Sequence, residues 1–167
     1  VNMILPQVID EHTQFVVLGT GDQVYEESFR YYENAYTGNV CSNIMYDETR
    51  AHRIYAGADA LLVPSQFEPC GLTQLIAMHY GTIPIVRETG GLKDTVEPYN
   101  MYSNRGNGFT FDHYDAGLLL DAINRAKVLY FEHRCCWDEM VQRDMDKNLS
   151  WENSAKRYRD LYLELTR

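Results

Sequence analysis

Five short β-rich runs alternate with helical segments along the chain, and this alternation limits the possible folds more than any other feature. We expect strands at residues 14–19, 40–46, 60–64, 83–86 and 108–111. Turns and segments with the apolar spacing of amphipathic helices separate these runs. Such alternation is typical of a parallel sheet with helices on both faces. The right-handed crossover rule then favours an α/β fold with a doubly wound, Rossmann-like sheet.

The predicted order of elements begins with a helix, although a doubly wound domain usually begins with a strand. Helices are expected at residues 1–11, 23–36, 47–58, 72–80, 93–97, 115–132, 135–147 and 151–165. We therefore predict one domain over residues 1–167 that lacks its first strand, or a sheet that is organised differently. Because the first strand of a Rossmann order is central, its loss would leave either a closed-up sheet or unpaired edges.

Composition excludes several classes of protein. The chain has 167 residues and 45% hydrophobic residues, which suits one globular domain. Its net charge of −9 disfavours nucleic acid and anionic membranes as partners, because both reward clustered Lys and Arg. No signal peptide or membrane-length apolar run is visible. The four cysteines have no zinc-type spacing, so we expect reduced thiols, a reducing compartment and no metal.

Residues 67–74 form the most informative stretch, because they follow the strongest predicted strand, 60–64. Ligands of open α/β sheets bind outside the carboxyl ends of the strands. Glu68 lies at such an end, on a turn shaped by Pro69 and Gly71. A lone glutamate is usually a solvated surface group. At the mouth of a sheet it also suits contact with sugar hydroxyls or stabilisation of an oxocarbenium charge.

Three further features suit the same edge of the sheet, each with a simpler alternative. The N–H groups of residues 71–73 suit a phosphate cradle or an ordinary helix start. The glycines of residues 89–92 suit the close approach of a ligand or a tight turn with positive φ. Tyr46, at the end of the second predicted strand, suits stacking on a nucleotide base or simple packing.

The sequence of residues 65–74, Ser-Gln-Phe-Glu-Pro-Cys-Gly-Leu-Thr-Gln, resembles the signature of bacterial glycogen synthases and plant starch synthases. The resemblance covers nearly the whole chain. It continues through residues 46–48, 52–54, 57–59, 81–86, 89–96, 106–109 and 150–151.

This resemblance implies a GT-B glycosyltransferase, in which two Rossmann-like domains face a cleft. It implies transfer of glucose from ADP-glucose to the nonreducing end of an α-1,4-glucan, with retention at the anomeric carbon and without a metal or cofactor. The chain looks like the C-terminal, nucleotide-sugar-binding domain. The segment 151–167 would then be the C-terminal helix that packs on the N-terminal, acceptor-binding domain, which is missing here.

The resemblance also implies roles for single residues. Glu68 is the catalytic acidic residue at the transferred sugar. The substrate-binding residues are Tyr46, which stacks on the base, and Cys70, Gly71, Leu72, Thr73, Gly90 and Gly91.

Two departures from the family pattern carry further expectations. The family's diphosphate-binding arginine and lysine lie on a first strand and loop that do not precede Val1, so the isolated chain is expected to be inactive. The second glutamate of related transferases is replaced by Ile76, as it is in the starch-synthase branch.

We also expect self-association of the chain through an exposed sheet edge or its tyrosine-rich surface.

Alternative functions remain open at this point. The chain also suits a nucleotide- or glucan-binding module without catalysis, or another GT-B nucleotide-sugar transferase. The resemblance implies a cytoplasmic location, in the bacterial cytosol or, in a plant, the plastid stroma.

Overall fold

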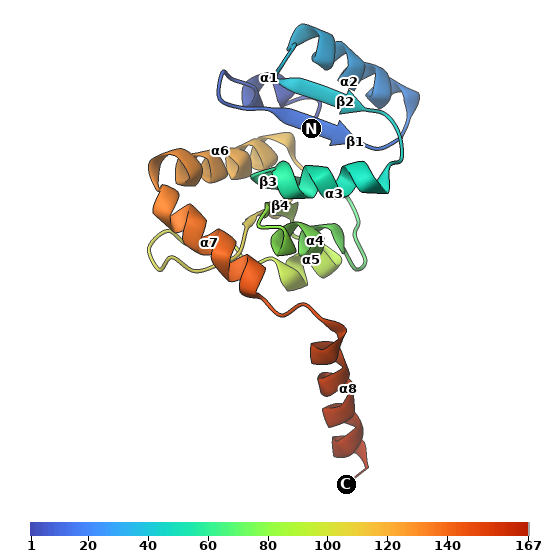
Figure 1. Ribbon diagram of the computed structural model, residues 1–167, viewed down its shortest axis with the longest axis vertical. Coiled ribbons are helices and arrows are strands. Elements are labelled where there is room, and N and C mark those ends of the chain that lie inside the picture. The colour runs from blue at the N-terminus through green and yellow to red at the C-terminus, as the bar shows by residue number, and fades with distance from the viewer. Residues whose placement is uncertain (167) are drawn as a thin grey trace.

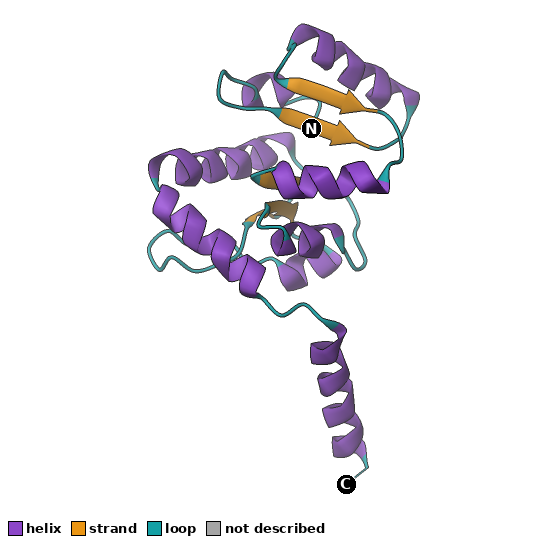
Figure 2. Ribbon diagram, viewed as in Figure 1, coloured by secondary structure: helices purple, strands orange, loops and turns teal. Residues whose placement is uncertain are grey.

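The computed structural model describes residues 1–166, with the side chain of residue 153 outside the description, and shows an α/β fold (Figures 1 and 2). The strands are β1 (Phe15–Leu18), β2 (Val40–Asn43), β3 (Ala60–Val63), β4 (Ile83–Arg87) and β5 (Phe109–Phe111). The helices are α1 (Leu5–Val8), α2 (Gln23–Ala35), α3 (Glu48–Gly57), α4 (Thr73–His79), α5 (Gly90–Thr95), α6 (Ala116–Glu132), α7 (Arg134–Asp146) and α8 (Trp151–Leu165).

All paired strands are parallel, as predicted, but they form two sheets. One sheet has the order β1-β2 and the other β3-β4-β5. Phe15 pairs with Val40 in the first sheet, and Ala60 pairs with Ile83 in the second. Within the described residues, the edge strands β1, β2, β3 and β5 therefore each keep one unpaired edge. The structure therefore has unpaired strand edges, which is one of the two arrangements that the sequence predicts.

Helix α6 joins the first residues of the chain to the larger sheet. The side chains of Ile4 and Val8, from the first turn of the chain, pack into the hydrophobic core around α6. Lys127 on α6 donates a hydrogen bond of 3.1 Å to the Val8 carbonyl oxygen and forms an ion pair with Asp10. The start of the chain is thereby held on the core of the larger sheet.

The larger sheet is buried on both faces, which explains why its strands are mostly apolar. Ile83 and Ile85 of β4 face the core formed by α6 and α7. Val86, from the same strand, packs with Leu92 and Val96 on the opposite face. In contrast, α2 and α3 contain no buried residue.

Strand β2 is shorter than predicted, and this changes the position of Tyr46. The strand ends at Asn43, so Tyr46 lies in the connection to α3 rather than on the strand. Asp47 is the N-cap of α3, as predicted, and its side chain accepts a hydrogen bond of 2.9 Å from the Arg50 N–H. The aspartate thus favours an early helix start over a longer strand.

Two predicted helices have different bounds. The first is confined to Leu5–Val8, because the Asp10 side chain accepts hydrogen bonds from the N–H of His12 and the hydroxyl of Thr13, which turn the chain away. Helix α5 begins at Gly90 instead of residue 93. The two glycines of the glycine turn predicted at residues 89–92 therefore lie in the first turn of this helix.

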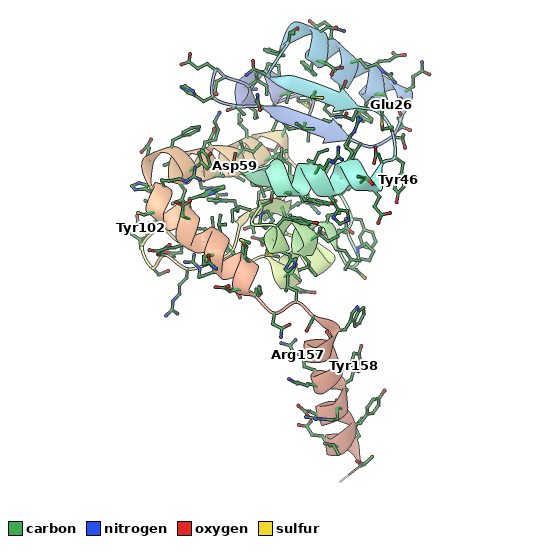
Figure 3. The ribbon with its side chains drawn as sticks, viewed as in Figure 1. Glu26, Tyr46, Asp59, Tyr102, Arg157 and Tyr158 are labelled. Carbon is green, nitrogen blue, oxygen red and sulfur yellow. The ribbon has the colours of Figure 1, made fainter. Side chains whose placement is uncertain are left out.

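Helix α8 extends away from the rest of the molecule (Figure 1). It accounts for the predicted C-terminal helix within residues 151–167, of which residue 167 lies outside the described residues. Trp151 and Tyr158 are 87% and 62% exposed, and Figure 3 shows Tyr158 projecting from the helix into solvent. Its packing partner stays a prediction.

The four cysteines are free thiols, as expected. Every helix within residues 1–166 is too short or too polar to span a lipid bilayer.

Asp144 is a buried carboxyl group without a partner. It lies on α7, which packs against α4 and α6, and it is 1% exposed. Neither carboxylate oxygen has a hydrogen-bond partner within the described residues. Burial raises the pKa of Asp144 to about 7, although the charges of Lys147 and Arg143 oppose the shift. The folded protein consequently keeps this proton at pH values where the unfolded chain has released it.

We predict that Asp144→Asn makes the stability of the protein less sensitive to a rise in pH through the acidic range. Because the native pKa is raised, the wild type binds more protons when folded and loses stability as pH rises from about 4 to 7. The full shift corresponds to roughly 4 kcal/mol, and we expect a loss of about 2–4 kcal/mol in the free energy of unfolding.

Urea denaturation at pH 5 and pH 8.5 measures this loss, which the Asn variant is expected to lack. Asp138→Asn is the matched control, because Asp138 forms an exposed ion pair with Arg134 on the same helix. Equal pH dependence in the wild type and the Asp144 variant would contradict the prediction.

Candidate functional site

The connection between β3 and α4, residues 64–72, carries the predicted catalytic glutamate and is called the Glu68 turn below. The Glu68 side chain is half-buried, and its Oε2 accepts a hydrogen bond of 3.2 Å from the Ser65 hydroxyl. Arg87, the last residue of β4, donates from Nη1 to the Gln66 carbonyl oxygen over 3.1 Å. The turn is therefore attached to the neighbouring strand at its entry, and its carboxylate is held from one side.

The exit of the Glu68 turn leaves a row of free backbone donors. Gly71 has a φ of 67°, in the left-handed region, where glycine is favoured. Leu72 is the N-cap of α4 and supplies no side-chain cap. Within residues 1–166, the N–H groups of Gly71, Leu72 and Thr73 have no hydrogen-bond acceptor. Such groups at a helix start suit a bound anion, as the sequence predicted.

The predicted glycine pair Gly90 and Gly91 lies directly against the Glu68 turn. The Gly91 N–H donates to the Glu68 carbonyl oxygen over 3.2 Å. A Cβ atom at Gly90 would lie 2.0 Å from the Glu68 carbonyl oxygen, and one at Gly91 would lie 1.7 Å from that of Cys70. The close approach that these glycines permit is thus an approach of two backbone segments. Contact of the pair with a ligand stays a prediction.

Tyr46 and the side chain of Cys70 are exposed. Tyr46 is 87% exposed at the N-terminal end of α3 (Figure 3). No hydrogen bond or aromatic contact of the described residues joins it to the Glu68 turn. Contacts among the described residues therefore join Glu68, Cys70 and the two glycines, and none of these contacts includes the tyrosine.

Two residues of this region were missed in the sequence. Arg87 places a cation at the carboxyl end of a buried strand, beside the ring of Tyr114 at 6.0 Å. Gln74 is fully buried in α4, next to the Glu68 turn. For Gln74, the sequence did contain a signal: a polar residue among the apolar residues of a short helix. Such a residue needs a specific hydrogen-bond partner when it is buried.

The Glu68 turn combines a carboxylate with backbone hydrogen-bond donors. One half-buried carboxylate adjoins free N–H groups on the same turn. No group of three or more His, Cys, Asp or Glu side chains within the described residues is arranged to hold a metal ion. A carboxylate next to backbone donors can hold hydroxyl groups, stabilise a positive charge and bind a phosphate oxygen.

Comparison with known proteins identifies the family of the chain. Residues 4–135 match the family described as "Glycosyl transferases group 1". The chain is similar to the glycogen synthases of Lachnospira eligens (51% identity over 97% of the chain) and Clostridium kluyveri (55% over 95%). It spans about a third of the length of these relatives, 34% and 33%.

Two solved structures are also similar. The catalytic domain of starch synthase IV from Arabidopsis thaliana, bound to ADP and acarbose, is 38% identical with a TM-score of 0.80, over 92% of this chain and 33% of that one. Sucrose-phosphate synthase from Thermosynechococcus elongatus shares the fold, with a TM-score of 0.66 at 24% identity over 99% of this chain and 41% of that one.

We predict that Gly91→Ala disrupts the Glu68 turn. The added Cβ would overlap the Cys70 carbonyl oxygen, so one backbone segment must move. We expect a loss of about 3 kcal/mol in the free energy of unfolding, at the upper end of overpacking effects. Gly57→Ala is the matched control, because a Cβ there meets nothing within 4 Å. Thermal or urea denaturation measures both variants, and equal stability of the two would contradict the packing described here.

Proposed function

The chain belongs to the group 1 glycosyl transferases, and from that premise we propose that it is the donor-binding domain of a retaining glucosyltransferase. The proposed reaction moves glucose from ADP-glucose to the nonreducing end of an α-1,4-glucan. The observation that carries the proposal is the Glu68 turn, where a half-buried carboxylate adjoins three free N–H groups. The similarity to glycogen synthases, and to a starch synthase bound to ADP and acarbose, supports this choice of substrates.

In this proposal, Glu68 is the catalytic residue. The bond between the anomeric carbon and the diphosphate oxygen breaks, and the diphosphate leaves with the electron pair. The carboxylate stabilises the positive charge that develops on the sugar. A bond to the acceptor hydroxyl forms on the same face, which retains the configuration, and the hydroxyl proton is released.

The donor is held by the remaining residues of the site. The N–H groups of Gly71, Leu72 and Thr73 bind the diphosphate, which they can do despite the net charge of −9 because the binding is local. Tyr46 stacks on the adenine, and its high exposure leaves its ring free for that contact. Cys70, Gly90 and Gly91 border the sugar.

The acceptor glucan would bind between this domain and a second one. The exposed Trp151 and Tyr158 of α8 would pack on that second domain, as in the predicted two-domain arrangement. We propose the cytoplasm as the location of the whole enzyme, and no nucleic acid or membrane as partner.

The first test combines Glu68→Gln with a binding measurement. In the complete polypeptide that contains this chain, we expect the variant to lose at least ~100-fold in glucose transfer, because removal of one charge-stabilising group typically costs this much. Its affinity for ADP is expected to stay within about threefold, since the N–H groups are unchanged. Glu132→Gln, at the exposed end of α6, is the control.

The isolated chain provides a second arm of this test. Calorimetric titration of the isolated chain is expected to show that it binds ADP and does not bind maltooligosaccharide. A separate activity assay of the isolated chain is expected to show no transfer of glucose. Binding of the glucan alone would overturn the site assignment. Transfer by the isolated chain would contradict its expected inactivity.

We further propose that the isolated chain self-associates through the unpaired edges of β1 and β3. Light scattering at high concentration is expected to give a mass above the 19.4 kDa of one chain. Val16→Lys, on β1, should lower this mass because a lysine disfavours edge pairing, whereas Val24→Lys, on the exposed surface of α2, should not. A monomeric mass for the wild type would refute this proposal.

A further inference from the structure

Gln74 is the most deeply buried polar residue near the Glu68 turn. It lies in the first turn of α4 and is 0% exposed, like its apolar neighbour Ala77. A buried amide is costly unless its donors and acceptor are satisfied. Its hydrogen bonds therefore indicate why glutamine occupies this position.

The Gln74 amide connects two segments of backbone. Its Nε2 donates to the Gly71 carbonyl oxygen over 2.8 Å and to the Thr95 hydroxyl over 3.0 Å. The Thr95 hydroxyl in turn donates to the Gly91 carbonyl oxygen over 2.6 Å. The amide orientation follows from these partners, because a carbonyl oxygen can only accept and the hydroxyl proton is already used.

Through these hydrogen bonds, Gly91 is connected to both ends of the Glu68 turn. The Gly91 N–H holds the Glu68 carbonyl oxygen, where the carboxylate branches from the chain. The Gly91 carbonyl oxygen is linked through Thr95 and Gln74 to Gly71, where the row of free N–H groups begins. The distance between the carboxylate and these donors is thus controlled by one residue outside the turn.

The amide oxygen of Gln74 argues against a role of this side chain in stability alone. Gln74 Oε1 has no hydrogen-bond partner within the described residues. An unpaired buried acceptor opposes folding, and an apolar side chain of the same length would avoid that cost. The polar side chain is better explained by what it positions than by its contribution to stability.

We propose that Gln74 and Thr95 are positioning residues of the donor site, which place the free N–H groups of residues 71–73 relative to the Glu68 carboxylate. The inference rests on the proposed function, because it assigns to these N–H groups the diphosphate of a nucleotide sugar. Neither residue contacts the donor itself. Both act through the backbone of Gly71 and Gly91.

The test compares Gln74→Met, Thr95→Val, Thr95→Ser and the Gln74→Met/Thr95→Val double variant in the complete polypeptide. We expect Q74M and T95V each to weaken ADP binding and raise the donor KM about tenfold, with an unchanged acceptor KM. The double variant should bind ADP no more weakly than the single variant with the lower affinity, because both changes break the same link. T95S keeps the hydroxyl and should recover most of the affinity lost in T95V.

The melting temperature separates positioning from stability. Q74M is expected to melt within a few degrees of the wild type, because it removes an unpaired acceptor together with two hydrogen bonds. If Q74M does not fold, T95V and T95S alone decide the inference.

Two results would overturn this inference while leaving the proposed function intact. The first is the result that the wild type binds ADP and that the Q74M and T95V variants bind it with the same affinity. The other is a double variant whose losses add, since additive losses mean independent roles. A wild-type polypeptide that binds no ADP would instead refute the proposed function, and the inference with it.

Discussion

The contact between the Gly91 backbone and the Glu68 turn is the constraint on which the candidate site depends. Strands β3 and β4 are parallel neighbours, so their following connections leave the sheet at the same edge. Because a Cβ at Gly91 would lie 1.7 Å from the Cys70 carbonyl oxygen, only glycine lets the two connections touch through their backbones. The Glu68 turn is thus held by a residue that lies outside it in the sequence. The positions of the carboxylate and of the free N–H groups both depend on this contact.

Within residues 1–166, three buried side chains carry polar atoms without a hydrogen-bond partner, and two of them hold the Glu68 turn. Gln74 Oε1 and Arg87 Nε, both buried without partners within the described residues, belong to side chains that hold the Glu68 turn. Asp144 is a third such group, on α7. Local violations of packing rules are expected where a structure serves function at the expense of stability. Two of the three cases fit that explanation, whereas Asp144 is predicted to make the stability of the fold depend on pH.

Burial is distributed unequally between the two sheets. The sheet β3-β4-β5 is covered on both faces and carries Glu68, whereas α2 and α3, next to the sheet β1-β2, contain no buried residue. Segments with few buried contacts open at low free-energy cost. Tyr46 extends from the less buried part, so the predicted base-stacking residue and the predicted catalytic residue lie on parts of the molecule that differ in burial.

Local sequence patterns determined the α/β class, the approximate strands and the position of the Glu68 turn, because apolar runs and glycines act over a few residues. They also pointed to the free N–H groups of residues 71–73, since a helix start leaves such groups whatever surrounds it. Only the tertiary structure decided that the strands divide into two sheets, and that Gly91 packs on Cys70 rather than in a free turn. The link from Gln74 through Thr95 joins residues 21 positions apart in the chain. Such a contact exists only once α4 and α5 have packed on the same sheet, and no local pattern records it.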